Sequence, residues 1–232
     1  MRRNRIFLLS DDLIFPDPKL ADAHGLLAIG GDLSAERLLL AYENGIFPWY
    51  SEDQPILWFS PDPRLVLFPA KIIVSRSLKK TINKKVFDIR FDSNFEEVIV
   101  ECSKIERKDQ DGTWITNDMI DAYIDLHNQG YAHSVEAYFE GSLVGGLYGV
   151  SLGGAFFGES MFHTMTDASK VALYYLVDKL KDWDFDFIDS QVVTEHMKNL
   201  GAEEIPRTKY LSLLKICLGK LTKIGNWSKS FY

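Results

Sequence analysis

Residues 134–162 contain three apolar runs separated by glycines, and this pattern constrains the fold more than any other feature. The runs are SVEAYFE, LVGGLYGVSL and AFFGESMF, with turns expected at Gly141 and at Gly153–Gly154. Strands joined by such short turns pair antiparallel, because parallel neighbours need a longer crossover. We therefore expect an antiparallel strand meander in this part of the chain.

The periodicity of apolar residues predicts the elements around the meander. Helices are expected at 34–44, after a capping box at Ser93–Glu96, and at 117–129, 168–183, 194–201 and 209–218. Further strands are expected at 88–91 and 185–192. The order helix, helix, antiparallel strands, long helix, strand, helix along the chain predicts an α+β fold with a mostly antiparallel sheet and flanking helices, of the N-acetyltransferase (GNAT-like) kind.

The segment 45–64 differs in composition from its surroundings. It has four prolines and five aromatic residues in twenty positions. Flexible linkers rarely carry so many aromatics, so we expect a packed, irregular segment. It closes a small N-terminal domain, 1–64, ahead of a larger domain, 65–232.

Bulk composition narrows the class of protein. Of the 232 residues, 46% are hydrophobic and 25% are charged, a balance typical of globular domains. No apolar run approaches the roughly 20 residues that span a bilayer, and no secretory signal peptide is evident. Cys102 and Cys217 lie far apart and indicate no disulfide framework. We expect a cytoplasmic protein without a membrane partner.

The basic residues are distributed unevenly along this acidic chain. A net charge of −7 argues weakly against nucleic acid as a partner. Between Lys71 and Lys85, however, the chain has six basic residues and no acid. Such a window can bind phosphates even on an acidic protein, although it can equally be a solvated helix face.

Glu159 is a single carboxylate within the apolar run GGAFFGESMF. A charge removed from water costs several kcal/mol unless it is paired, so this position should be paired, open to solvent or functional. On an extended strand Phe157, Glu159 and Met161 share one face. Two interpretations stay open: a carboxylate paired within the fold, or the polar point of an apolar binding site.

The run IDSQ (188–191) supplies two more polar candidates. If this stretch is extended, Asp189 and Gln191 share a face, and Asp189 can accept a hydrogen bond from the Gln191 amide. The Gln191 carbonyl oxygen would then point outward as an acceptor for an ammonium or hydroxyl group. The alternative is an ordinary polar strand end.

The segment before the helix at 168–183 bears on the acyl donor. Enzymes of this fold that use acetyl-CoA present a glycine-rich turn there, which holds the pyrophosphate on backbone N–H groups. The segment HTMTDAS (163–169) has no glycine. We therefore expect an activated acyl group other than acetyl-CoA.

Other candidates carry less weight. The five histidines show no metal-binding spacing, and no serine lies in a G-x-S-x-G elbow. Several aromatic side chains could stack on nucleotide bases or belong to the core: Phe47, Trp49, Trp58, Phe59 and Trp114.

A series of motifs resembles the leucyl/phenylalanyl-tRNA–protein transferase family of the bacterial N-end rule. The matching stretches span residues 25–207 in order: GLLAIGGDLS (25–34), GIFPWY (45–50), LWFSPDPR (57–64), GTWIT (112–116), YAHSVE (131–136), LVGGLYGV (143–150), FGESMF (157–162), ASKVAL (168–173), IDSQ (188–191) and LGAEEIPR (200–207). GIFPWY and FGESMF are the most specific.

The resemblance implies a reaction and its partners. Leu or Phe passes from leucyl-tRNA or phenylalanyl-tRNA to the α-amine of a protein with N-terminal Arg or Lys. A peptide bond forms, and the product is marked for N-end-rule degradation. No cofactor or metal is implied, and we expect a monomer.

The resemblance also implies roles for individual residues. The catalytic group would be Asp189, Gln191 and Glu159. The aminoacyl pocket would be lined by Leu147, Phe156, Gly158, Met161, Leu173 and Ile188. Contacts to tRNA would come from Trp49, Trp114, Arg76, Lys79, Lys80, Lys84 and Lys85.

Two other functional classes are compatible with the residues alone. One is a small-molecule N-acetyltransferase with an atypical CoA loop. The other is a non-catalytic module that binds aminoacyl-tRNA or basic N-termini. The polar residues Glu159, Asp189 and Gln191 favour an enzyme over such a module.

Overall fold

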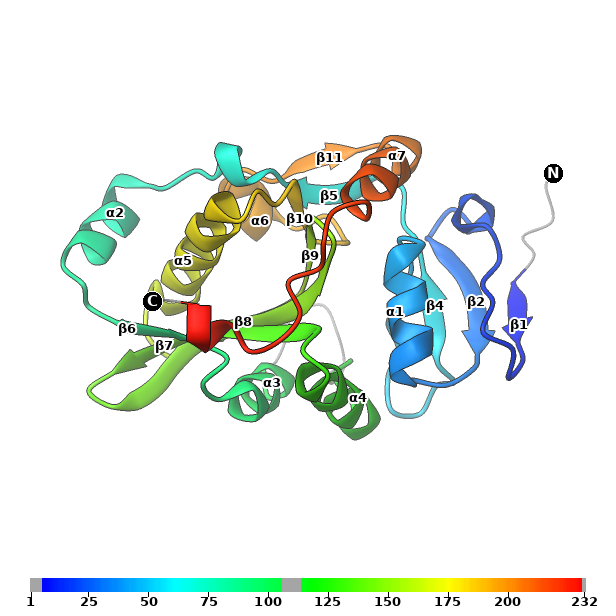
Figure 1. The fold of residues 1–232 in the computed structure, drawn as a ribbon, viewed down its shortest axis with the longest axis horizontal. Coiled ribbons are helices and arrows are strands. Elements are labelled where there is room, and N and C mark those ends of the chain that lie inside the picture. The colour runs from blue at the N-terminus through cyan, green and yellow to red at the C-terminus, as the bar shows by residue number, and fades with distance from the viewer. Residues whose placement is uncertain (1–5, 106–113, 231–232) are drawn as a thin grey trace.

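The chain forms two β-sheets flanked by helices in a computed structural model, which describes residues 6–105 and 114–230 (Figure 1). The smaller, four-stranded sheet has the order β1-β2-β4-β3. Its strands are β1 Phe7–Leu9, β2 Leu26–Gly30, β3 Phe47–Pro48 and β4 Leu57–Phe59. Helix α1 (Ala35–Glu43) lies between this sheet and the rest of the molecule (Figure 1).

The larger sheet has seven strands in the order β11-β5-β10-β9-β8-β7-β6. Its strands are β5 Arg64–Leu67, β6 Asp88–Phe91, β7 Ala132–Phe139, β8 Ser142–Leu152, β9 Ala155–His163, β10 Phe187–Asp189 and β11 Glu203–Ile205. Among the described strand pairs of this sheet, only β9–β10 is parallel. The predicted meander is therefore confirmed as β7, β8 and β9.

Helices cover both faces of the larger sheet (Figure 1). They are α2 Arg76–Asn83, α3 Phe95–Ser103, α4 Asn117–Asn128, α5 Ala168–Asp182, α6 Glu195–Asn199 and α7 Arg207–Cys217. Alternate strand residues face opposite sides: Leu147 packs in the cluster with α5, and Tyr148 packs in the cluster with α3 and α4. The predicted α+β class, mostly antiparallel with flanking helices, is confirmed.

Three local predictions are wrong. Helix α3 begins at Phe95 after Asn94, and no capping box forms, because the Ser93 hydroxyl donates instead to the buried Glu136 at 3.0 Å. Strand β10 ends at Asp189 rather than at 192. The segment 45–64 is not irregular throughout, because it supplies β3, β4 and the first residue of β5.

One hydrophobic cluster joins the N-terminal part to the larger sheet. It includes Tyr42 and Trp58 from the N-terminal part and Phe95, Tyr123 and Phe157 from the rest of the chain. The boundary between residues 64 and 65 stays a prediction, since the two parts share this core.

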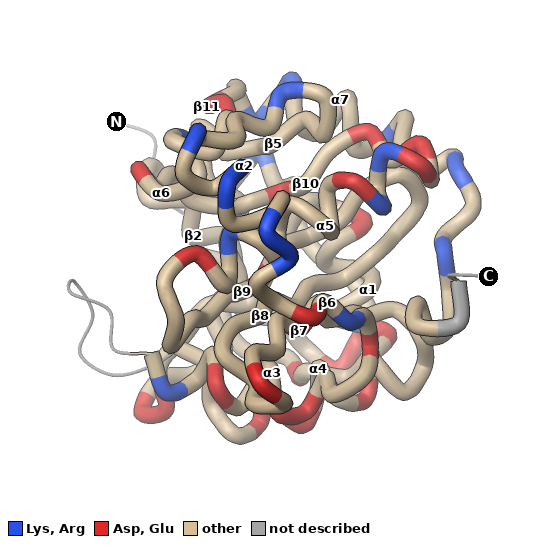
Figure 2. The backbone as a smooth tube through the Cα atoms, turned by 90° about the vertical axis from the view of Figure 1, so that its left-hand side faces the viewer, with Lys and Arg blue, Asp and Glu red and all other residues tan. Residues whose placement is uncertain are grey.

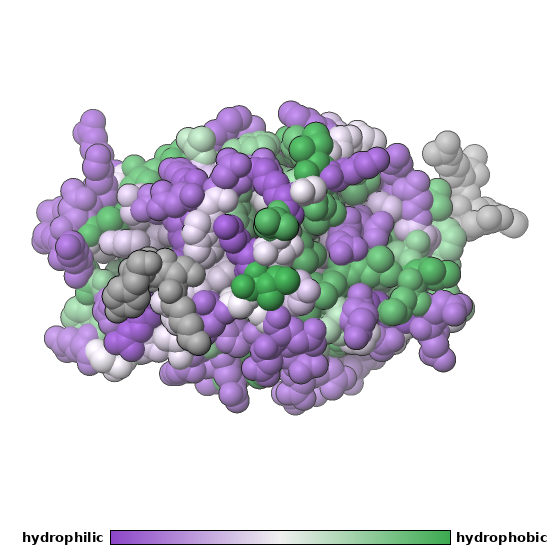
Figure 3. Space-filling view, viewed as in Figure 1, coloured by the Kyte–Doolittle hydropathy of each residue, from purple (hydrophilic) through white to green (hydrophobic). Residues whose placement is uncertain are grey.

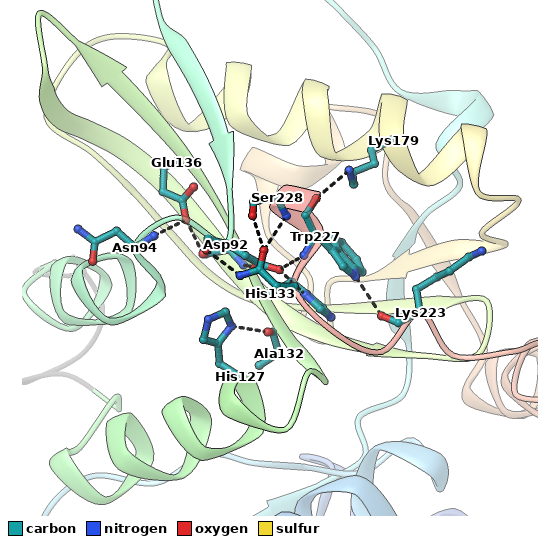
Figure 4. Close-up of polar contacts among 12 residues, drawn as sticks. Asp92, Asn94, His127, Ala132, His133, Glu136, Lys179, Lys223, Trp227 and Ser228 are labelled. Carbon is teal, nitrogen blue, oxygen red and sulfur yellow. Dashed lines mark hydrogen bonds and ion pairs between the residues drawn. The ribbon is translucent and has the colours of Figure 1, made fainter. Parts of the chain in front are cut away.

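The C-terminal segment packs against the larger sheet through Trp227. Its backbone N–H donates to Asp92 Oδ2 at 2.7 Å, and its ring stacks on His133 with 3.7 Å between ring centroids (Figure 4). His133 Nδ1 lies 2.9 Å from the same carboxylate oxygen, and burial lowers the pKa of His133. Asp92 therefore ties strand β7 to the end of the described chain.

The surface shows hydrophilic residues with hydrophobic ones between them, the latter most continuous over the four-stranded sheet and α1 (Figure 3). Leu8 and Ile14, which are 83% and 64% exposed, belong to this N-terminal part. Among the described residues, no helix has the length and apolarity needed to cross a membrane.

Candidate active site

A cavity of about 500 Å³ lies beside strands β8, β9 and β10 and helix α5. All six residues expected in an aminoacyl pocket line it: Leu147, Phe156, Gly158, Met161, Leu173 and Ile188. Leu147 and Phe156 come from adjacent strands on the face that α5 covers. The structure thus brings these six positions together around one largely apolar space.

Glu159, in the middle of β9, lines the same cavity and is only 8% exposed. Its carboxylate accepts three hydrogen bonds. Tyr42 Oη donates to Oε1 at 2.7 Å, Tyr123 Oη to Oε2 at 3.2 Å, and Gln191 Nε2 to Oε1 at 2.7 Å. The carboxylate is therefore both paired within the fold and placed at the cavity.

The surroundings of Glu159 change its acidity. Burial raises its pKa to about 7, although the three hydrogen bonds favour the charged form. Burial also raises the pKa of Tyr42 and of Tyr123 well above the ordinary value, so both phenols stay protonated and act as donors. Glu159 can consequently gain or lose a proton near neutral pH.

Asp189, at the end of β10, is completely buried and does not line the cavity. Arg64 donates to it through two nitrogens, Nε to Oδ1 at 2.9 Å and Nη2 to Oδ2 at 2.7 Å. Tyr210 Oη also donates to Oδ2, at 2.7 Å. Burial opposes the charge of Arg64, but Asp189 outweighs it and raises the pKa of the guanidinium.

Gln191 differs from the prediction in how it is held. Its φ of 60° is rare for a residue other than glycine, so the backbone turns immediately after β10. Asp189 Oδ1 accepts the backbone N–H of Gln191 at 2.9 Å, and not its side-chain amide. The expected Asp189–Gln191 side-chain pair is therefore wrong, because the strand does not continue far enough to place both on one face.

Glu159 orients the Gln191 side chain instead. An ionised carboxylate only accepts hydrogen bonds, so the amide NH₂ of Gln191 faces Glu159 and the carbonyl oxygen faces away. Gln191 also lines the cavity. The acceptor expected from the sequence is therefore present, but a different carboxylate fixes its orientation.

The residues expected to contact tRNA fall into two groups. Trp49 and Trp114 line the cavity with Glu159. Arg76, Lys79, Lys80, Lys84 and Lys85 do not line it; they are exposed in and just after α2, and none forms an ion pair within residues 6–105 and 114–230. Figure 2 shows basic residues gathered on and beside this helix.

Of the other aromatic candidates, Phe47 also lines the cavity. Trp58 is fully buried in the core, and Lys71 pairs with Glu203 at 2.6 Å. Gly112 and Thr113, from the motif GTWIT, lie outside the described residues. Within the described part of the chain, no cluster of three His, Cys, Asp or Glu residues could hold a metal ion.

Four residues of the site were not identified from the sequence. Tyr42 and Tyr123 hold Glu159, while Arg64 and Tyr210 hold Asp189. Tyr42 and Tyr123 lie on the buried sides of α1 and α4, where an aromatic residue in the sequence indicates a core position. A buried carboxylate needs hydrogen-bond donors, so Glu159 indicates that such donors exist. The sequence near Tyr42 and Tyr123 does not indicate that these two phenols supply them.

Comparison with known proteins gives consistent matches. Residues 66–215 match the family described as leucyl/phenylalanyl-tRNA protein transferase, and residues 31–62 match the N-terminal domain of that family. The chain is 58% identical over 222 residues to the leucyl/phenylalanyl-tRNA–protein transferase of Syntrophobacter fumaroxidans, covering 96% of this chain and 95% of that one. It is 54% identical over 226 residues to the same-named protein of Myxococcus xanthus, covering 97% of each.

The solved structures that match have much lower sequence identity to this chain. L-PGS from Bacillus licheniformis has a TM-score of 0.39 and 13% identity, over 74% of this chain and 57% of that chain. A GCN5-related N-acetyltransferase from Kribbella flavida has a TM-score of 0.38 and 8% identity, over 72% of this chain and 59% of that chain.

Proposed function

Because the chain belongs to the leucyl/phenylalanyl-tRNA protein transferase family and is an aminoacyltransferase, we propose that it transfers Leu or Phe to proteins with N-terminal Arg or Lys. The donor is the aminoacyl ester of tRNA, and the acceptor is the protein's α-amine. The observation that carries the proposal is the meeting of an apolar pocket, the Gln191 acceptor and the Glu159 carboxylate at one cavity.

The apolar part of the cavity suits the side chain of the donor amino acid. Leu147, Phe156 and Leu173 offer hydrocarbon surface, and Gly158 leaves space beside Ile188. Met161 adds a flexible thioether that can adapt to either a branched or an aromatic side chain. These contacts support acceptance of both Leu and Phe.

The chemistry needs little beyond positioning. The nitrogen of the α-amine attacks the ester carbonyl, the new C–N bond forms, and the ester C–O bond breaks as the ribose oxygen leaves with a proton. An α-amine has a pKa of about 7.7–8.0, so its deprotonation at neutral pH costs only about 1 kcal/mol. Positioning two reactants contributes roughly 7–11 kcal/mol, which is the larger effect.

Gln191 and Asp189 support that positioning. The Gln191 carbonyl oxygen accepts a hydrogen bond from the attacking amine and orients its lone pair toward the ester. Asp189 acts through Gln191, because it accepts the backbone N–H that holds the turn. Arg64 in turn holds Asp189, which makes Arg64 and Asp189 positioning residues.

Glu159 is proposed to receive the cationic side chain of the protein's N-terminal residue. A carboxylate offers about four acceptor positions, and three are already occupied by Tyr42, Tyr123 and Gln191. One position and the negative charge remain for an Arg or Lys side chain. The rival cation is the ammonium of the aminoacyl group itself; equal binding of an Arg-peptide to Glu159→Gln and to the parent protein would favour that rival.

We propose that two separate sets of residues bind tRNA: the tryptophans of the cavity and the exposed basic residues in and just after α2. Trp49 and Trp114 would hold the terminal adenosine, and the exposed bases of α2 would bind backbone phosphates. We also propose that the protein acts as a monomer. Aminoacyl-tRNAs are cytoplasmic, so we place the reaction and the resulting N-end-rule marking in the cytoplasm.

One assay tests the function directly. Purified protein is mixed with labelled leucyl-tRNA and a peptide that begins with Arg, and RNase-resistant label on the peptide is measured. We expect transfer to Arg- and Lys-peptides and none to the same peptide with a blocked α-amine. Absence of transfer to both basic peptides would refute the proposal.

A further inference from the structure

Part of the cavity lining is polar and is not used in the reaction described above. It includes His163 at the end of β9, Ser169 in the first turn of α5, and His196 in α6. Lys170 follows Ser169 directly in the chain. We call these four residues the polar rim.

The members of the polar rim lie close together. His163 Nδ1 is 3.5 Å from Ser169 Oγ. His196 has its pKa lowered first by partial burial and then by the charges of Lys170 and His163, as expected when several cationic groups are neighbours. Ser169 is buried, with 3% of its surface exposed, whereas His163 and His196 keep a substantial part of their surface open to solvent. The polar rim thus combines a buried hydroxyl with two solvent-exposed imidazole rings.

Acidic residues also lie beside the polar rim. Lys170 Nζ lies 3.3 Å from Asp167 Oδ1, and Glu195, next to His196, pairs at 3.3 Å with Lys198. Asp167 also accepts a hydrogen bond from Thr81 of α2, at 3.4 Å. The rim is therefore linked to the helix that carries the exposed basic residues.

We propose that the polar rim binds the phosphodiester that joins the terminal adenosine of aminoacyl-tRNA to the preceding nucleotide. The proposal rests on the proposed function. The aminoacyl ester and this phosphate are attached to the same ribose, at its 3′ and 5′ sides, so the phosphate must lie near the cavity whenever the ester lies in it. The histidine and serine donors of the cavity lining suit such an anion, Lys170 lies next to Ser169 in the chain, and most other lining residues are apolar.

The test compares two stable analogues that differ only in the phosphate. One is 3′-leucylamido-3′-deoxyadenosine, and the other carries a methyl phosphodiester on its 5′ oxygen. We expect the wild-type protein to bind the phosphodiester about tenfold more tightly at low salt, because charge-assisted hydrogen bonds are the strong ones. The double variant His163→Asn/His196→Asn should lose that preference.

Controls separate the proposal from folding and from the proposed function. His24→Asn, an exposed histidine outside the cavity, should retain the full preference. The double variant should keep its affinity for the unphosphorylated analogue, which shows that the pocket is intact. Equal binding of both analogues by the wild type, or equal loss of both in the double variant, would overturn the proposal. Failure of the wild type to bind either analogue would instead count against the proposed function.

Discussion

The side-chain amide of Gln191 donates to Glu159 Oε1 at 2.7 Å, so the carboxylate within the apolar run of β9 fixes the orientation of the site's acceptor. Glu159 therefore has two consequences for the reaction: it supplies negative charge at the cavity and it points the Gln191 carbonyl oxygen away from itself. Both depend on whether the carboxylate is ionised.

Replacing Glu159 by Gln should lower kcat/KM for an Arg-peptide by roughly tenfold to a hundredfold, since a hydrogen bond to a charged group contributes about 1.5–3 kcal/mol. Affinity for leucyl-tRNA should change little, because the pocket keeps its shape. Transfer kinetics and tRNA binding are measured on the same preparation. A tRNA affinity that falls as far as kcat/KM would contradict this assignment.

The same variant should change how stability depends on pH. Burial raises the pKa of Glu159 from 4.5 to about 7 in the folded protein. Between these values the folded state binds more protons than the unfolded state, so this group's stabilisation is complete below pH 4.5 and is lost as pH rises through about 7.

The free energy of unfolding of the wild type should therefore fall relative to Glu159→Gln between pH 4.5 and 7, by about 2–3 kcal/mol in total. Urea unfolding at pH 5, 6, 7 and 8 measures both proteins. The difference should level off above pH 7. A difference that is the same at all four pH values would show that Glu159 titrates normally in the fold.

Arg64→Ala should destabilise the protein by about 3–5 kcal/mol, because it leaves the buried Asp189 carboxylate without its cation. Lys71→Ala is the matched control: it breaks an ion pair with Glu203 whose side chains are 54% and 43% exposed, and it should cost less than about 1 kcal/mol. Denaturant unfolding distinguishes the two. If both variants lost a similar free energy of unfolding, the Arg64–Asp189 ion pair would contribute no more to stability than an exposed one.

The long elements were predictable from the sequence, as was the four-residue strand β6, whereas several of the shortest strands were not. Strands β7, β8 and β9 have 8, 11 and 9 residues, enough for alternation to be visible between glycine turns. Strands β3 and β11 have 2 and 3 residues, too few for any period. Such strands are defined by pairing with distant segments, as β5 pairs with β10 and β11.

The residues that line the candidate site were also predictable from the sequence, whereas their hydrogen-bond partners were not. The resemblance placed the six pocket residues and the three polar residues, and Glu159 stood out as a charge among apolar neighbours. Their hydrogen-bond partners could not be predicted, because Tyr42 lies 117 positions from Glu159 and Arg64 lies 125 positions from Asp189. Only the folded chain brings such pairs together, and the turn at Gln191 then decides which carboxylate holds its amide.

Gly158→Val should shift the choice of donor. A Cβ at Gly158 would lie 3.6 Å from Ile188 Cγ2 and from the Asp189 carbonyl oxygen, which is ordinary contact, so the fold tolerates a side chain that takes space in the cavity. We expect kcat/KM for phenylalanyl-tRNA to fall about tenfold more than that for leucyl-tRNA. Leu173→Ala enlarges the same cavity and should move the ratio in the opposite direction. A ratio unchanged in both variants would exclude these residues from the aminoacyl pocket.

Changing Lys79, Lys80 and Lys84 to Ala should weaken tRNA binding and flatten its dependence on salt. Each phosphate contact contributes about 0.7–0.9 to the slope of log K against log salt, so three lost contacts should reduce the slope by roughly 2–3. The matched control is Lys181→Ala/Lys209→Ala/Lys215→Ala, which removes the same charge from exposed positions in α5 and α7. Its slope should stay near that of the wild type, because the change in net charge is equal and only the location differs. If both triple variants flatten the slope equally, overall charge rather than the α2 surface governs binding; if neither does, α2 lies outside the tRNA interface.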